Sequence, residues 1–119
     1  MVNGCIALLA GHDADPALVK ALGGPTADWY LTAGPQHRYW LRVWGARGLL
    51  WAWEDSAAPA TVAALSDSAW RVREMAAKVA GRHLVDDALP ALHTLQDDPV
   101  ARVRTAASRA LLRFTGLSR

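Results

Sequence analysis

Hydrophobic and polar residues repeat in a regular order along the last two thirds of this chain. The stretch Asp67–Ala80 matches Asp98–Leu111, and Gln36–Leu49 is a weaker copy, so the period is about 31 residues. Within each copy, hydrophobic or small residues recur every three or four positions, which is typical of one face of an α-helix. A fixed period of this length indicates stacked units, each too small to bury its hydrophobic face alone.

Proline, glycine and aspartate divide each unit into a shorter and a longer helix. We expect three long helices, at about 37–53, 70–81 and 100–115. Shorter helices are expected at 28–33, at 59–65 and around Leu89–Leu95. Asp67 or Ser68 should cap the second long helix, and Asp86 or Asp87 the last short one. Since no hydrophobic run alternates with a period of two, the sequence predicts an all-α fold of about three stacked helical hairpins.

The 119 residues have room for one domain. We divide it into an N-terminal cap (1–27), a degenerate repeat (28–56) and two clear repeats (57–84 and 85–119). The cap is irregular, as expected of a terminal unit with a neighbour on one side only. Its hydrophobic residues need a surface to pack on, and we expect them to cover the tryptophan stripe of the next unit. The alternative is that this stripe is an exposed aromatic binding patch.

One sequence motif occurs in both clear repeats. Asp67 is followed by Val72-Arg73 and then by the small pair Ala76-Ala77, and the same order returns from Asp98 onward. This motif resembles the second helix of HEAT repeats, especially the short HEAT-like repeats first noted in phycobilisome lyases. The resemblance covers about three quarters of the chain and implies a short right-handed α-solenoid with an irregular N-terminal cap.

The resemblance also implies a structural role for the aspartates and arginines of the motif. In HEAT repeats these residues form a ladder of polar contacts between neighbouring units. The corresponding residues are Asp67 and Asp98 together with Arg42, Arg73 and Arg104. Gln36 stands where the first unit would have its aspartate, so this rung should be the weakest.

One flank of the long helices carries the candidate partner-binding residues. Positions i, i+4, i+7 and i+11 form rows that should lie side by side when the units stack. The rows contain Trp40, Trp44, Arg47 and Trp51; Arg71, Met75, Lys78 and Arg82; and Arg102, Ala106, Arg109 and Arg113. They would form one surface, graded from aromatic to basic, on the side where HEAT arrays commonly bind partners. The alternative is that these bases are simply solvated.

Charge and composition limit the possible functions only weakly. A net charge of +2 and a pI of about 9.1 permit an acidic partner without requiring one. The single Cys5 excludes an internal disulfide and fits a reducing compartment. The N-terminal hydrophobic run lacks a basic region and breaks at Gly11, too early for a signal peptide or a membrane span. We therefore expect a cytoplasmic protein that does not bind membranes.

Catalytic motifs are absent from the sequence. The four histidines and Cys5 do not have the spacing of a zinc site, and no glycine-rich phosphate loop occurs. We therefore expect a protein that is not an enzyme and that binds no metal or cofactor.

Three kinds of function fit these observations. The first is a protein-interaction adaptor or scaffold that binds a protein or an acidic peptide. The second is a nucleic-acid-binding module, in which bases hold phosphates and indoles stack on nucleobases. HEAT-like DNA glycosylases also need a carboxylate in the groove, and the basic rows contain none, so we expect no such chemistry. The third, a helper of a chromophore protein, follows only from the short-repeat resemblance.

Overall fold

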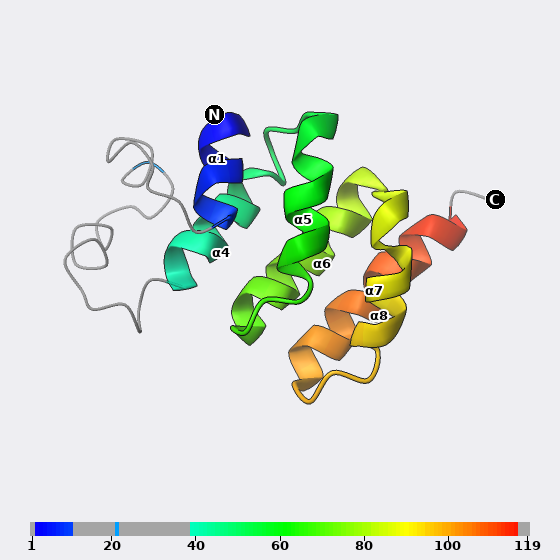
Figure 1. Cartoon of the computed structure of the whole chain (residues 1–119). Coiled ribbons are helices and arrows are strands. Elements are labelled where there is room, and N and C mark those ends of the chain that lie inside the picture. Colours follow the sequence, from blue (N-terminus) through cyan, green and yellow to red (C-terminus); the bar gives the residue numbers. More distant parts are fainter. Residues whose placement is uncertain (1, 11–20, 22–38, 117–119) are drawn as a thin grey trace.

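The computed structural model describes residues 2–10, 21 and 39–116, and every regular element within them is helical. The α-helices are α1 (Val2–Leu9), α4 (Tyr39–Gly48), α5 (Ala58–Ala64), α6 (Trp70–His83), α7 (Leu89–Leu95) and α8 (Ala101–Gly116), shown in Figure 1. One-turn 3₁₀ helices, Asp55–Ala57 and Asp86–Ala88, lead into α5 and α7. The all-α prediction is confirmed for the described residues. The predicted helix at 28–33 and Gln36 lie outside them.

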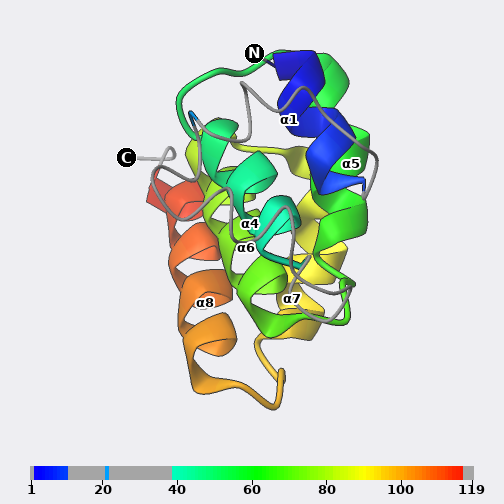
Figure 2. The same cartoon turned by 90° about the vertical axis from the view of Figure 1, so that its left-hand side faces the viewer.

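The helices form two layers. Figures 1 and 2 show the long helices α4, α6 and α8 side by side in one layer and α1, α5 and α7 in the other. Helix α6 contacts α4 on one side and α8 on the other, while α5 packs on α6 and α7 packs on α8. Helix α1 packs on α4 and touches α5, so it has the place beside α4 that α5 has beside α6. The packing of α4 thus depends on a segment far from it in the sequence.

Three helix ends differ from the sequence prediction. Helix α4 stops at Gly48, because Leu49, Leu50 and Trp51 donate to carbonyls three residues back and turn the chain. Helix α6 continues past Gly81 to His83, where Leu84 ends it in a left-handed conformation with φ 53°. Asp86 and Asp87 do not cap α7; they lie in the preceding 3₁₀ helix, and neither helix start has a side-chain cap.

Small residues bring neighbouring helices into close contact at two crossings. A Cβ atom on Gly81 would lie 2.8 Å from the Cα atom of Ala110 in α8. A Cβ on Gly45 of α4 would lie 2.7 Å from the backbone oxygen of Cys5 in α1. Both distances are shorter than atoms of this kind tolerate, so glycine is required at these two helix crossings.

The predicted ladder is present between the described units. Arg42 donates from Nε and Nη2 to the carboxylate of Asp67, at 2.8 and 3.2 Å. Arg73 donates in the same way from Nε and Nη2 to Asp98, at 2.8 and 3.3 Å. Each aspartate also accepts a backbone N–H two residues further on. For Asp67 this N–H belongs to Ala69, the N-cap residue of α6, and the helix has no side-chain cap, so the prediction that Asp67 or Ser68 caps it was wrong. These contacts tie each long helix to the turn that precedes the next one.

The environment of Asp98 favours its charged form. Burial alone would raise the pKa of this carboxyl, but hydrogen bonds from Arg73 and from the Val100 amide act in the opposite direction. The positive charges of Arg73 and Arg104 add to these bonds, and the pKa lies below its ordinary value. Asp98 is therefore ionised at neutral pH and contributes to the stability of the fold.

Candidate partner-binding groove

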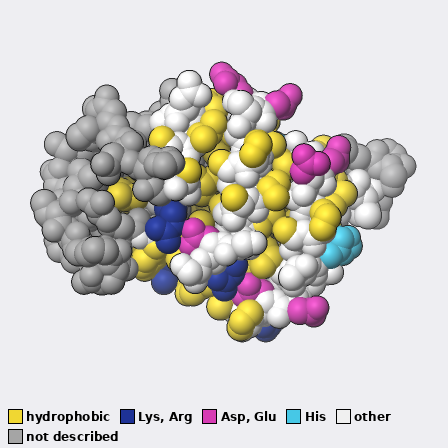
Figure 3. All heavy atoms as spheres, viewed as in Figure 1, with side chains coloured by type: hydrophobic (Ala, Val, Ile, Leu, Met, Phe, Trp, Pro, Cys, Tyr) yellow, Lys and Arg dark blue, Asp and Glu magenta, His cyan; other side chains and the backbone are white. Residues whose placement is uncertain are grey.

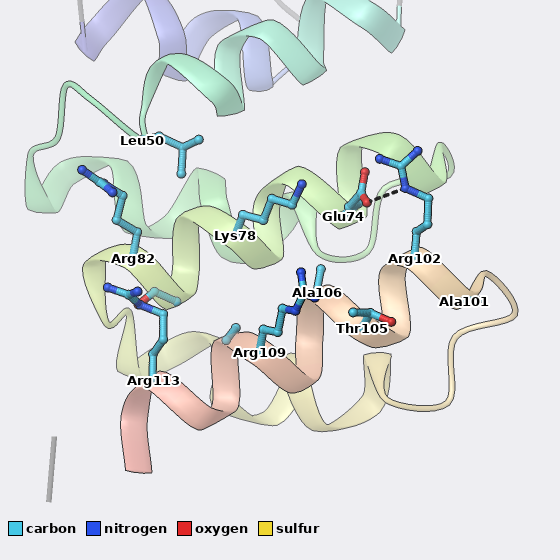
Figure 4. A pocket seen from close by; sticks show the side chains of 12 residues that line it. Leu50, Glu74, Lys78, Arg82, Ala101, Arg102, Thr105, Ala106, Arg109 and Arg113 are labelled. Carbon is cyan, nitrogen blue, oxygen red and sulfur yellow. Dashed lines mark hydrogen bonds and ion pairs between the residues drawn. The ribbon is translucent and has the colours of Figure 1, made fainter. Parts of the chain in front are cut away.

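Helices α6 and α8 form the sides of an open groove of about 550 Å³ (Figure 4). One side comes from Glu74, Lys78, Gly81 and Arg82. The other comes from Ala101, Arg102, Thr105, Ala106, Arg109, Ala110 and Arg113, and Leu50 completes the lining from the turn after α4. Figure 4 shows Arg82 and Arg113 at one end of the groove and Glu74 and Arg102 at the other.

The basic rows predicted for the second and third units meet in this groove. The basic residues that line the groove are all exposed: Lys78, Arg82, Arg102, Arg109 and Arg113. Between them lie Gly81, Ala106 and Ala110, which are buried and carry little or no side chain. Because small residues form the floor, a ligand could approach the helix backbones closely while its charged groups meet the basic rims.

The remaining predicted residues are not part of the groove lining. Trp44 is only 4% exposed, so its assignment to a binding surface is wrong. Trp44 points inward from α4. Helical spacing alone cannot predict which side of a helix is covered by neighbouring helices. Trp40, Arg71 and Met75 are half-buried, and Arg47 is exposed on α4 outside the lining residues.

Trp51 lies outside a helix, contrary to the prediction. It is 78% exposed and stands in the turn that follows α4. The guanidinium carbon of Arg82 lies 4.9 Å from its ring centre, a cation–π distance. The expected cover of the tryptophan stripe therefore does not extend to Trp51, which instead stands beside one end of the groove.

Glu74 also lines the groove, and it was not among the residues predicted from the sequence. Glu74 is 8% exposed and lies among the basic side chains of the groove, and its carboxylate accepts a bond from Arg102 Nε at 2.9 Å. The predicted row on α6 began at Arg71, but the face that meets α8 begins three positions later. Glu74, Lys78 and Arg82 are also spaced four residues apart, so the sequence contained this row as well.

Arginines cover indole rings at the Glu74 end of the groove. The guanidinium of Arg71 lies 5.2 Å from the ring centre of Trp40 and 4.4 Å from that of Trp70. Arg102 lies 5.4 Å from Trp70 as well as bonding Glu74. Trp40 is therefore contacted by an arginine of the next unit, while Trp70 is contacted by its sequence neighbour Arg71 and by Arg102 of the next unit.

Arg113 connects the groove to the end of α6. Its Nε donates to the backbone oxygen of Gly81 at 3.0 Å, in the last turn of that helix. The carbonyls at a helix C-terminus carry partial negative charge and favour a cation. Arg113 is thus held in place at the groove rim by a contact with the fold.

The cysteine and one histidine of the described residues are held by contacts within the fold. Cys5 is fully buried, and burial raises the pKa of its thiol, which disfavours the reactive thiolate. His83 stacks on Trp53, and its Nε2 lies 2.6 Å from the backbone oxygen of Leu49.

Within residues 2–10, 21 and 39–116, no three His, Cys, Asp or Glu side chains are grouped so as to hold a metal ion. None of the described helices has the length and hydropathy needed to cross a membrane.

The family model for HEAT repeats matches residues 38–112, which is more than half of the chain and includes both sides of the groove except Arg113. The chain belongs to the HEAT repeat family. HEAT repeats commonly mediate protein–protein interactions and are typically non-catalytic. No curated protein and no solved structure matches the chain.

The face opposite the groove has a different character. Figure 3 shows the side of the HEAT units formed by α1, α5 and α7, where hydrophobic side chains are spread over the helices and acidic ones gather at the edges. Basic side chains are few on this face, and several lie beside acidic ones. The concentration of positive charge is therefore a property of the layer of long helices.

Proposed function

We propose that this HEAT protein is a non-catalytic adaptor or scaffold of the cytoplasm, built as a short right-handed α-solenoid within a single domain. Its ligand would be an acidic segment of a partner protein, bound in the groove between α6 and α8. The observation that carries the proposal is the charge of the groove lining: five basic residues face one acidic residue, Glu74, which already bonds Arg102. Four basic residues then remain to attract the carboxylates of a ligand.

The shape of the groove supports a peptide segment as the ligand. Its floor of Gly81, Ala106 and Ala110 offers little side-chain area for gripping a small molecule. It does let a helix or an extended chain approach closely, with Leu50 and Trp51 available as apolar contacts at the Arg82 end. In such interfaces a few apolar anchors supply most of the affinity, while the charges speed encounter and fix orientation.

Nucleic-acid binding is the second candidate. The bases and the exposed Trp51 favour it, because guanidinium groups hold phosphates and an indole can stack on a nucleobase. Against it, arginines already cover faces of Trp40 and Trp70, so these rings offer less area for stacking.

Fluorescence anisotropy can distinguish the two candidates. The probes are a labelled peptide rich in Asp, Glu and Leu, a twin with Asn and Gln in place of the acids, and labelled single-stranded and duplex DNA. We expect the acidic peptide to bind at physiological salt and its neutral twin to bind at least about tenfold more weakly. DNA binding with a log–log salt slope of about 0.7 to 0.9 per phosphate would favour the nucleic-acid function instead.

Charge reversal locates the binding site. Lys78→Glu and Arg109→Glu lie in the middle of the groove and should each weaken binding of the acidic peptide by about tenfold or more. Arg47→Glu is the matched control, because it changes the net charge equally but lies on α4 outside the lining. An equal loss with all three variants would mean that overall charge, and not the groove, attracts the peptide.

A further inference from the structure

The ladder of the HEAT units ends in an arginine that has no carboxylate partner among the described residues. Arg42 and Arg73 each bind the aspartate of the following unit through two nitrogens. Arg104 occupies the same position in the last unit and is exposed. In the described part of the chain its side chain makes one hydrogen bond, from Nη1 to the backbone oxygen of Asp98 at 2.7 Å. Arg73 makes the corresponding bond to Asp67 and binds Asp98 in addition.

Within the residues that the structure describes, a second residue of α8 also lacks the contact with a following unit that its counterpart on α6 makes. Gly81 is a residue of α6 at a close contact with α8, and its counterpart one period later is Leu112. Leu112 is 67% exposed, although it stands where the preceding unit contacts its neighbour. Among the described residues, a guanidinium without a carboxylate partner and an exposed leucine therefore occupy two positions that, on α6, contact the next unit.

We propose that this outer face of α8, defined by Arg104 and Leu112, is a second docking surface, separate from the groove. Its occupant is a helix of a partner protein that begins with an aspartate. The aspartate would pair with Arg104 as Asp98 pairs with Arg73, and apolar side chains of the helix would cover Leu112. Charge complementarity, seen twice in the filled rungs, identifies the chemistry of the partner.

The filled rungs explain why the carboxylate should come from the start of a helix. Asp67 Oδ1 accepts the N–H of Ala69 at 2.8 Å, and Asp98 Oδ1 accepts the N–H of Val100 at 2.9 Å. In both cases the aspartate belongs to the turn that begins a long helix and is oriented by its own backbone. An oriented carboxylate loses less conformational entropy on pairing than one on a mobile chain.

A second copy of this chain fits the surface poorly. Helix α8 carries four arginines, Arg102, Arg104, Arg109 and Arg113, and no acidic residue, so two α8 faces would repel each other. A copied unit also could not approach as closely as α8 approaches α6, because Leu112 replaces Gly81 at the crossing. The occupant is therefore a different helix, with room for a leucine at the contact.

The test uses a labelled, stapled peptide that begins with the Asp-Ser-Ala turn of residues 67–69 and continues as an alanine- and leucine-rich helix. Its twin has Asn in place of the leading Asp. We expect the full chain to bind the Asp peptide about fivefold more tightly than the Asn twin, a value between those for exposed and buried ion pairs. Arg104→Ala should remove this preference, and Arg104→Lys should restore part of it, since lysine keeps the charge but not the two-nitrogen geometry.

The controls separate this surface from the groove. Arg47→Ala and Lys78→Ala should leave the preference for the Asp peptide unchanged, while Lys78→Ala weakens binding of the acidic groove peptide. Circular dichroism should show that Arg104→Ala remains folded, with only a small loss of melting temperature from its lost bond to the backbone oxygen of Asp98, which excludes misfolding as the cause of a loss of binding. Equal binding of the two peptides, or no binding of either, would overturn the proposal. A dimer of the parent chain in sedimentation that Arg104→Ala dissociates would overturn it in favour of a second copy.

Discussion

The arginines of the ladder and those of the groove lie on the same helices but differ in what surrounds them. Arg73 is 15% exposed and binds Asp98, which is 5% exposed. Arg109, five residues beyond the ladder position Arg104 on the next long helix, is exposed and lines the groove. A charge paired with an oriented carboxylate stabilises the fold, whereas a charge in an open groove remains available to a ligand.

Arg102 stands between these two kinds. Its side chain is 66% exposed, yet it bonds Glu74, whose side chain is 10% exposed. An exposed arginine gains little from a surface pair, because water screens the charge and the side chain loses freedom. The buried carboxylate gains more, since without Arg102 it would lose its hydrogen-bonded partner. Residue type alone therefore does not distinguish an arginine that stabilises the fold from one that is available to a ligand.

The largest effect is expected from breaking the Arg73–Asp98 rung. Asp98→Ala and Arg73→Ala should each lower the free energy of unfolding by about 1 to 3 kcal/mol, because the remaining partner is left unpaired in a mostly buried position. Urea unfolding followed by circular dichroism measures this loss. In a double-mutant cycle the two changes should cost less together than the sum of the single losses. Additive losses would mean that the two side chains do not stabilise the fold through their contact.

Acid should weaken the same rung. The pKa of Asp98 is lowered in the folded chain, so its contribution is present above the unfolded value of about 4 and is lost as the pH falls through the folded pKa. We expect the difference in unfolding free energy between the parent and Asp98→Asn to narrow below about pH 4. Urea titrations at neutral and acidic pH test this expectation, and a difference that does not change with pH contradicts it.

The Arg42–Asp67 rung should matter less than its neighbour. Its side chains are 26% and 13% exposed, against 15% and 5% for Arg73 and Asp98. Solvent screens the more exposed pair, so Arg42→Ala should cost about 1 kcal/mol, less than Arg73→Ala. The two variants can be compared by their urea midpoints in one experiment. A larger loss for Arg42→Ala would show that exposure does not rank the rungs.

The smallest effect on stability is expected in the groove. Lys78→Ala and Arg109→Ala remove exposed charges and should change the free energy of unfolding by no more than about 0.5 kcal/mol. The same substitutions should weaken binding of the acidic peptide. A groove variant that lost as much stability as Arg73→Ala would place its side chain in the structural network instead.

Much of the fold could be predicted because it depends on relations that repeat along the chain. The period located the helices, and the motif that begins at Asp67 and returns at Asp98 identified the ladder through its family resemblance. Local spacing is sufficient for such predictions, because a helix fixes which residues share a face.

The candidate site could be predicted only in part. Lys78, Arg82, Arg102, Arg109 and Arg113 come together as expected, whereas Glu74 was missed and Trp44 was placed on the wrong surface. The sequence by itself determined the repeating helices and the charges they carry. Only the tertiary structure decided where α1 packs, which flank of α6 meets α8 and where α4 turns away. The physical reason is that helical spacing defines the faces of one helix, but close packing against its neighbours selects which face is buried and which remains open.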